Sequence, residues 1–300
     1  MKNNSDKQAN KVILEAPAKI NLSLLITGRR ADGYHTLDSL IVFAETHDRI
    51  TISPNKGLAF KICGPFRKML ASDQNNSILQ AANLIVERTG VKPNASIILE
   101  KNLPVASGIG GGSSNAAAAI HGLNQFWKTG LNNQEVREIG LSIGTDVPVC
   151  LLGLPARVSG IGENIEILST IPSFGLLLVN PGAAVSTSEV FRLRSGSFSR
   201  EVSSENIGFK NPQALANYLI GLRNDLEVPA RKVCPQIADV LKVIGATEEC
   251  LLSRLSGSGA TCFGIFKNRA AASAAKDKIC SKYPAWWVNS TIIRNGKVFN

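Results

Sequence analysis

The sequence predicts an α+β protein built from two mixed domains. Strand-like and helix-like segments occur in both halves of the chain, and the pattern restarts after about Gly162. The 300 residues are enough to bury two cores, and we find no internal repeat. We therefore expect a division near residues 160–175, with domains at 1–165 and 166–300.

The first half of the chain begins with strands. Residues 11–27 alternate apolar and polar side chains over much of their length, as in Ile20 and Asn21, which is typical of a strand. Apolar residues at helical spacing, followed by a glycine, predict a helix at Ser77–Arg88. The other segments expected here are strands at Leu37–Glu45, Arg49–Ser53, Leu58–Cys63 and Ala95–Glu100, a helix at Asn133–Ile143, and an apolar strand near Val147–Pro155.

The second half carries its own cap and turn signals. Ser186–Glu189 matches a capping box, so a helix should start there. The polar, serine-rich stretch Ser195–Lys210 is typical of a mobile insertion, and a second glycine turn lies at Gly257–Ala260. The remaining elements expected are strands at Leu176–Val179, Leu251–Leu255, Thr261–Phe266 and Trp286–Ile293, and helices at Pro212–Leu222, Pro229–Ile244 and Arg269–Ser281.

Composition narrows the class of protein. The six cysteines are scattered without a Cys-x-x-Cys pair, which disfavours a zinc site or a disulfide framework and favours a reducing cytoplasm. After the polar stretch from Met1 to Lys11, the apolar run is too short for a signal peptide, and no stretch suits a membrane span. The net charge of +10 would suit nucleic acid, but the basic residues are dispersed and no binding motif is evident. Small polyanionic substrates explain the charge equally well.

The strongest functional signal is a glycine-rich loop between a strand and a helix. Four glycines, at 108 and 110–112, allow positive φ angles and close approach of a ligand, and the alanines after Asn115 predict a helix. The unpaired N–H groups of its first turn would form an anion site, most commonly for phosphate. The loop lacks the lysine of a Walker A motif and the spacing of a dinucleotide fingerprint. A flexible linker is the alternative, but linkers normally have more polar flanks.

Other polar residues stand where chemistry is possible. Asp146 lies in a turn after a helix, where local sequence favours a capping role. Lys19 and Asn21 interrupt an apolar strand, and a lysine there should face a cleft or a carboxylate. The turn Asp32–His35 carries polar and aromatic groups and would also suit a plain hairpin tip. The three histidines show no metal-binding spacing, and His121 is expected to be structural.

Together, these motifs match one known family. They are Pro-Ala-Lys-Ile-Asn-Leu, Asp-Gly-Tyr-His, Gly-Gly-Gly-Ser-Ser-Asn, Gly-Thr-Asp-Val-Pro and Leu-Ser-Gly-Ser-Gly-Ala, in that order across residues 16–260. The combination resembles the galactokinase–homoserine kinase–mevalonate kinase–phosphomevalonate kinase (GHMP) superfamily. The resemblance implies an N-terminal ATP domain like ribosomal protein S5, a C-terminal ferredoxin-like domain, and an active site in the cleft between them.

Two of these motifs, Lys-Ile-Asn-Leu and Asp-Gly-Tyr-His, resemble those of one group within the superfamily. The members of that group phosphorylate a cytidine diphosphate-linked alcohol in non-mevalonate isoprenoid synthesis. The resemblance implies ATP and Mg²⁺ as cofactors, with Lys19 and Asp146 as the catalytic pair. The residues implied for ATP are Pro104, Val105, Ala106, Ser107, Gly108, Ile109, Gly110, Gly111, Gly112, Ser113 and Ser114, with Asn115, Lys101 and Asn76 near the nucleoside. Those implied for the acceptor are Asn21, Tyr34, His35, Thr187 and Phe191, with Gly257, Ser258 and Gly259 closing over the phosphates. The sequence assigns no set of metal ligands, and Ser114 is only a candidate.

Two other functions stay open at this stage. One is a sister kinase for a small alcohol such as homoserine or a mevalonate derivative, although Tyr34, His35 and Phe191 suit a nucleobase better. The other is a non-catalytic protein that senses ATP and a metabolite, which the presence of both Lys19 and Asp146 disfavours. A monomer and a homodimer are both compatible with the sequence.

Overall fold

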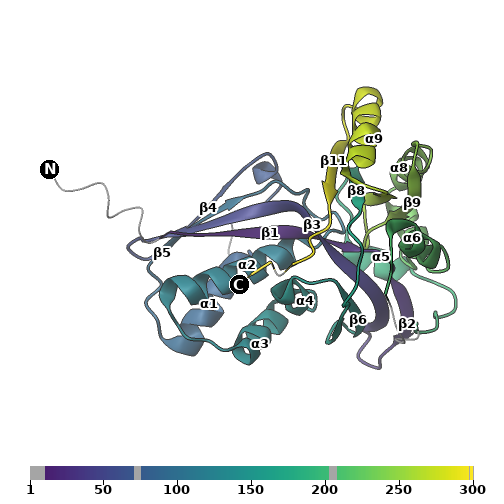
Figure 1. Cartoon of the computed structure of the whole chain (residues 1–300). Coiled ribbons are helices and arrows are strands. Elements are labelled where there is room, and N and C mark those ends of the chain that lie inside the picture. Colours follow the sequence, from purple (N-terminus) through teal and green to yellow (C-terminus); the bar gives the residue numbers. More distant parts are fainter. Residues whose placement is uncertain (1–10, 71–75, 203–207, 297, 300) are drawn as a thin grey trace.

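The computed structural model describes residues 11–70, 76–202, 208–296 and 298–299, which form two lobes, each with its own sheet (Figure 1). Residues 1–10, which hold nearly all of the polar stretch noted at the start of the sequence, lie outside this description. Strand β7 (Asn164–Ile167) belongs to the first sheet, and strand β8 (Gly175–Asn180) to the second. The division after residue 165 stays a prediction, and β7 crosses that position.

One long strand organises the first sheet. β3 (His35–Ser53) runs without a break, so the two strands predicted in this region are one. Its neighbours are β1 (Val12–Asn21), β2 (Leu25–Arg29), β4 (Leu58–Cys63), β5 (Ala95–Glu100) and β6 (Ala156–Gly160). β1 pairs with β3 along almost its whole length, and this tertiary pairing outweighs the polar residues that suggested an interruption. β6 and β7, which no local pattern had predicted, extend the sheet beyond β3.

Four helices cover one face of this sheet (Figure 1): α1 (Ser77–Thr89), α2 (Gly111–Trp127), α3 (Asn133–Ile143) and α4 (Val147–Leu152). The fully buried alanines at 116–119 let α2 lie close against β1. The helices predicted at Ser77–Arg88 and Asn133–Ile143 are confirmed. The strand predicted near Val147–Pro155 is wrong, because Pro148 lies in the first turn of α4, where a missing N–H costs nothing.

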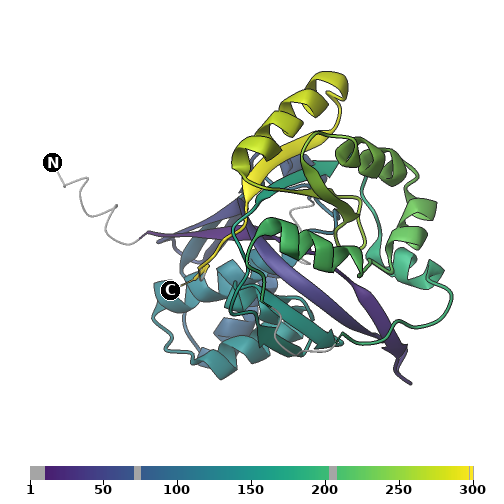
Figure 2. The ribbon, with the colours of Figure 1, turned by 45° about the vertical axis from the view of Figure 1, so that its right-hand side comes forward.

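The second lobe has an antiparallel sheet in the order β11-β8-β10-β9, with helices packed against it (Figure 2). Its further strands are β9 (Cys250–Leu255), β10 (Cys262–Phe266) and β11 (Trp287–Ile292). Its helices are α5 (Thr187–Leu193), α6 (Pro212–Ile220), α7 (Glu227–Val233), α8 (Gln236–Gly245) and α9 (Arg269–Lys282). Ser186 caps α5 as predicted, but the single helix expected at Pro229–Ile244 is wrong, because Pro235 separates α7 from α8.

The two sheets share an apolar core. Alternate residues of β8 point to opposite faces, as strand geometry requires. Leu177 and Val179 pack with residues of α7, α8 and α9, whereas Leu176 and Leu178 belong to a cluster with Ile20 and other residues of the first sheet. A continuous apolar contact therefore holds the lobes together beside the cavity described below.

The serine-rich stretch between α5 and α6 is tied to the first lobe where the structure describes it. The N–H of Ser199 donates to the carbonyl of Ile26 at 2.8 Å, and the N–H of Val202 donates to the carboxylate of Asp38 at 2.7 Å. These contacts tie Ser199 and Val202 to the first lobe; the mobility predicted for Ser195–Lys210 stays a prediction, and residues 203–207 lie outside the described part.

The residues after β11 return to the first lobe (Figure 1). The N–H of Arg294 donates to the carbonyl of Phe43 in β3 at 2.7 Å. The ring of Phe299 stacks on His121 of α2, with 4.6 Å between ring centroids. His121, which lies on the helix that follows the glycine loop, is therefore packed in the structure, as predicted.

All six cysteines are unpaired, as expected. In the ranges that the structure describes, no helix combines the length and the apolar character needed to cross a membrane.

Candidate active site

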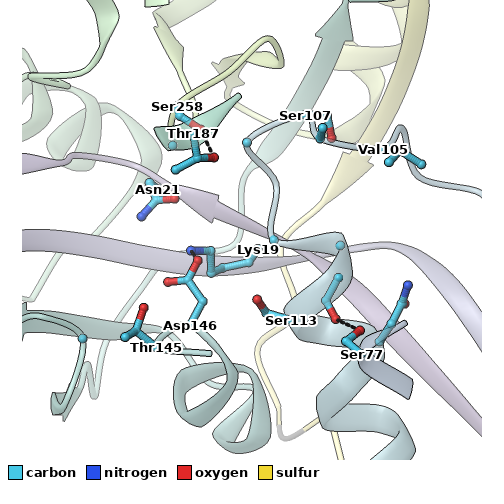
Figure 3. A pocket seen from close by; sticks show the side chains of 18 of the residues that line it. Lys19, Asn21, Ser77, Val105, Ser107, Ser113, Thr145, Asp146, Thr187 and Ser258 are labelled. Carbon is cyan, nitrogen blue, oxygen red and sulfur yellow. Dashed lines mark hydrogen bonds and ion pairs between the residues drawn. The ribbon is translucent and has the colours of Figure 1, made fainter. Parts of the chain in front are cut away.

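A cavity of about 560 Å³ lies where the lobes meet, and residues from both lobes line it (Figure 3). Most of the residues singled out in the sequence lie on its wall. They are Lys19, Asn21, Asn76, Lys101, Pro104, Val105, Ala106, Ser107, Gly108, Gly110, Gly111, Gly112, Ser113, Asn115, Asp146, Thr187, Phe191, Gly257 and Ser258. Five do not line it: Tyr34, His35, Ile109, Ser114 and Gly259.

Lys19 and Asp146 meet inside this cavity. The ammonium of Lys19 donates to Oδ2 of Asp146 at 2.6 Å, across 127 residues of sequence. The lysine side chain is 5% exposed, whereas that of Asp146 is 48% exposed to the cavity. Asp146 does occupy the N-cap position of α4, but its side chain makes no capping hydrogen bond. The capping role favoured by local sequence is therefore wrong, and the expectation that Lys19 faces a carboxylate is confirmed.

The first turn of α2, which follows the glycine loop, lies in the wall of the same cavity. Gly110 is the N-cap, with φ of +63°, and no side chain among the described residues caps this helix. The first turn therefore leaves backbone N–H groups without an intrahelical partner at the positive end of the helix dipole. This is the geometry that binds anions such as phosphate.

The loop glycines are also required by contacts within the protein. Gly108 has φ of +75°, and a Cβ there would collide with the carbonyl of Ser256 and lie 2.6 Å from the nitrogen of Gly259. A Cβ on Gly110 would lie 2.9 Å from the Cβ of Lys19. The loop thus packs directly on Lys19 and on the glycine turn of the second lobe.

The glycine turn of the second lobe is joined to the loop by one serine. The hydroxyl of Ser256 donates to the carbonyl of Gly108 at 2.9 Å and accepts from the N–H of Asn21 at 3.2 Å. On the cavity side, the hydroxyls of Ser258 and Thr187 lie 2.7 Å apart (Figure 3). Two glycine turns from different lobes therefore form adjoining parts of the cavity wall.

The residues expected near a nucleoside gather at the end formed by α1 and α2. Asn76 caps α1 by accepting from the N–H of Ile78 at 2.9 Å, and Ser77 donates to the carbonyl of Gly112 at 3.0 Å. Asn115 is 3% exposed, and its Oδ1 has no hydrogen-bond partner among the described residues. A buried acceptor in a cavity wall needs a donor, which a bound ligand would supply.

The end of the cavity nearest Phe191 is less complete. The rings of Phe191 and His35 lie 5.3 Å apart, but only Phe191 lines the cavity, and the side chain of Tyr34 is exposed. Burial lowers the pKa of His35, and the nearby Arg29 and Arg194 lower it further. The imidazole is therefore neutral at pH 7, with one nitrogen that donates and one that accepts.

Ser114, the candidate metal ligand, points away from the cavity. Its hydroxyl donates to the sulfur of Cys150 in α4 at 3.5 Å, and the side chain is buried. Burial raises the pKa of the Cys150 thiol to about 12, so the thiol stays protonated. Ser113, its neighbour, is the serine that lines the cavity.

Sequence reasoning missed several polar residues that arrange the site. Ser39 accepts from the side-chain amide of Asn21 at 2.8 Å, and Asp48 binds Lys101. Ser256 could have been suspected from its place beside Gly257, but Ser39 and Asp48 lie inside β3, and no local pattern distinguishes them.

Two family models match the chain. One, described as the GHMP kinases N terminal domain, matches residues 76–154, and the other, GHMP kinases C terminal, matches residues 209–285. The chain is 46% identical over 275 residues to a 4-diphosphocytidyl-2-C-methyl-D-erythritol kinase of Paramagnetospirillum magneticum, covering 92% of this chain and 96% of that protein. A protein of the same name from Rhodospirillum rubrum is 43% identical, with 94% and 92% covered.

Solved structures show the same architecture. A crystal structure of 4-(cytidine 5'-diphospho)-2C-methyl-D-erythritol kinase matches with a TM-score of 0.78 at 29% identity, covering 95% of this chain and 100% of that one. A homoserine kinase from Cytophaga hutchinsonii matches with a TM-score of 0.67 at 17% identity, covering 95% and 96%. At that identity the second match shows a shared fold alone.

Proposed function

Because the chain belongs to the GHMP kinases, we propose that it transfers the γ-phosphoryl group of ATP to a hydroxyl of 4-diphosphocytidyl-2-C-methyl-D-erythritol, in non-mevalonate isoprenoid synthesis. Family membership makes the protein a kinase, and the two-domain α+β fold expected from the motifs is confirmed. The observation that carries the chemistry is that the Lys19–Asp146 pair and the uncapped first turn of α2 share one cavity. The acceptor rests on the printed names of relatives that match over most of this chain.

Asp146 is the group that handles the acceptor's proton. Its carboxylate accepts the hydroxyl proton as the oxygen attacks the γ-phosphorus, and the bond to the β-phosphate breaks to release ADP. Lys19, held 2.6 Å from Asp146, stabilises the alkoxide as it forms. Positioned general-base catalysis contributes about 10²–10⁴-fold. Most of the remaining barrier in phosphoryl transfer is lowered by positioning and by neutralising charge.

The glycine loop and its neighbours bind the nucleotide. The free amides of the first turn of α2 cradle the phosphates, as helix N-termini commonly do. Asn115 accepts a hydrogen bond from the nucleoside through its unpaired Oδ1, while Asn76 and Lys101 complete that end of the cavity. Pro104–Ser107 form part of the wall of this cavity.

Mg²⁺ fits this site as an ion held chiefly by the nucleotide. The described residues contain no group of three or more His, Cys, Asp or Glu that would bind a metal by itself. Mg²⁺ typically keeps several waters and takes one or two carboxylates with substrate phosphates. Ser113 and Asp146 are the oxygen donors on the wall that suit this role, and the ion would neutralise phosphate charge.

The acceptor's cytosine is recognised around Phe191 and His35. The Phe191 ring stacks on the base, and the neutral His35 imidazole, 5.3 Å from Phe191 and off the cavity wall, offers a donor and an acceptor to the base edge once it turns inward. Asn21, Thr187 and Ser258 lie between this end and Lys19 and hold the remainder of the acceptor. Tyr34 reaches the base only by moving inward from its exposed position.

The test is ATP-dependent phosphorylation of the cytidine diphosphate-linked alcohol, compared with its uridine analogue, homoserine and mevalonate. We expect rapid turnover of the first and slow turnover of the uridine analogue, because an unpaired buried polar group costs about 1–3 kcal/mol. Equal use of both analogues, or turnover of homoserine or mevalonate instead, would overturn the assignment of the acceptor. A cytoplasmic location, the absence of a nucleic-acid partner, and a monomeric or dimeric state stay predictions.

A further inference from the structure

Lys101, placed above at the nucleoside end of the cavity, forms a buried ion pair beneath the glycine loop with Asp48, which has no part in the mechanism above. Asp48 of β3 is fully buried, and Lys101, just after β5, is 3% exposed; the ammonium donates to Oδ2 of the carboxylate. A buried ion pair is often no more stabilising than apolar residues of the same size. A role in positioning would therefore explain this pair better than a role in stability.

Asp48 also fixes the backbone at the point where the loop begins. Its Oδ1 accepts from the N–H of Asn102 at 2.6 Å and from the N–H of Leu103 at 2.8 Å. One carboxylate therefore holds two consecutive amides and a lysine side chain at the entry to the glycine loop.

The pair is oriented with its positive end toward the cavity. Lys101 lines the cavity, and Asp48 does not. A Cβ on Gly111, the first residue of α2, would lie 3.1 Å from Nζ of Lys101 and 3.9 Å from Oδ2 of Asp48. The ammonium therefore lies against the first turn of α2, where it adds to the positive end of the helix dipole.

We propose that Asp48 is a positioning residue for nucleotide binding: it holds the Lys101 ammonium against the first turn of α2 and fixes the entry to the glycine loop. This inference rests on the proposed use of ATP. A Cβ on Gly111 would press on the Lys101 ammonium, which would have to shift by a few tenths of an ångström to admit it.

The structure offers a matched control on the same strand. Asp38, also in β3, is 2% exposed and binds a cation and a backbone N–H, as Asp48 does. Its partners are Arg157, through Nε at 3.0 Å and Nη2 at 2.8 Å, and the N–H of Val202 at 2.7 Å. Asp38 does not touch the glycine loop.

The experiment compares Asp48→Asn with Asp38→Asn. ATP affinity is measured by calorimetry without acceptor, and KM for ATP and for the acceptor is measured with both present. We expect Asp48→Asn to weaken ATP binding about ten-fold or more, because an interaction with a charged group is lost, with a smaller change in acceptor KM. Asp38→Asn should lower the unfolding temperature similarly and change ATP affinity less than about two-fold.

A double variant separates positioning from folding. Asp48→Asn leaves Lys101 as an unpaired buried cation, so the protein could lose stability for that reason alone. Asp48→Asn combined with Lys101→Met removes the charge and should recover the unfolding temperature while ATP affinity stays weak. Wild-type ATP affinity in the double variant, or equal losses of ATP affinity in Asp48→Asn and Asp38→Asn, would overturn the proposal. Because ATP binding is measured without acceptor, a wrong acceptor assignment would leave this result intact.

Discussion

The two ends of the cavity are built in different ways. The phosphate end is built mainly of backbone: the glycine loop leads into the first turn of α2, and at Gly108 and Gly257 the loop and the glycine turn of the second lobe pack together without room for a Cβ. The acceptor end consists of side chains from separate elements, with Phe191 on α5, His35 at the start of β3, and Tyr34 exposed in the turn before it. The first end is fixed by the fold, whereas the second is completed by the acceptor.

Asp146 stands between the two ends, and its loss should have the largest effect. Asp146→Asn keeps the size of the side chain but cannot take the proton, so we expect turnover to fall about 10²–10⁴-fold. ATP affinity, measured without Mg²⁺, should stay nearly unchanged, since the glycine loop does not depend on this carboxylate. Steady-state kinetics and ATP calorimetry provide the measurement, and near-normal turnover would remove Asp146 from catalysis. Lys19→Met should cause a comparable loss if the two residues act as a unit.

A substitution at Gly108 should disrupt the phosphate end of the cavity. Gly108→Ala should abolish measurable ATP binding and lower the unfolding temperature, because a Cβ collides with the second lobe's glycine turn. The left-handed conformation adds about 1–2 kcal/mol of strain for an L-residue. Gly130→Ala is the control, since Gly130 has φ of +71° and nothing within 4 Å of its Cβ position. If both variants bind ATP equally weakly, the strain and not the contact between lobes is responsible.

The acceptor end is tested with Phe191→Ala. Stacking of a base on an aromatic ring contributes about 1–3 kcal/mol, so KM for the acceptor should rise roughly 5- to 150-fold. KM for ATP should change little, because Phe191 lies at the other end of the cavity. Phe198→Ala is the matched control: Phe198 follows the same helix and contacts Arg194, but it does not line the cavity. An equal rise in KM for ATP would contradict the separation of the two ends.

The smallest expected effect is a change in the pH dependence of stability, caused by His121 on α2, the helix whose first turn forms the phosphate end. Burial lowers the pKa of His121. A hydrogen bond to the carbonyl of Leu151 raises it, but by less than burial lowers it. Below about pH 6.5 the unfolded chain takes up a proton that the folded His121 resists, so stability falls as pH falls through the window between the lowered pKa and 6.5. His121→Gln should flatten this part of the stability profile in urea unfolding at pH 5–8. Parallel profiles for the two proteins would show that His121 does not titrate in this way.

The sequence predicted best what is local. The glycine loop, the helix after it and the capping residue Ser186 were all visible within a few residues, because turns and caps are short-range features. That Lys19 faces a carboxylate in a cleft could also be predicted, since a lysine in an apolar strand needs a partner.

What the sequence did not reveal depends on contacts between distant residues. Asp146 looked like a helix cap because its partner is 127 residues away. Asp48 gave no signal within a strand, although it binds the start of the glycine loop. The contact between His35 and Phe191 depends on how α5 lies against the first lobe, which no local pattern determines.

The return of the chain from β11 to the first lobe has a consequence for synthesis on the ribosome. Phe299 packs on His121 and Val298 packs against Gly153, so residues made after the second lobe complete the core around helices made much earlier. Domains generally fold as units during synthesis, with the N-terminal one first. In this protein α2, which follows the glycine loop, and α4, whose N-cap position is Asp146, can complete their packing only after the second lobe has emerged. A ribosome stalled after β10 would therefore hold a first lobe that has its sheet but lacks part of the support behind its catalytic helices.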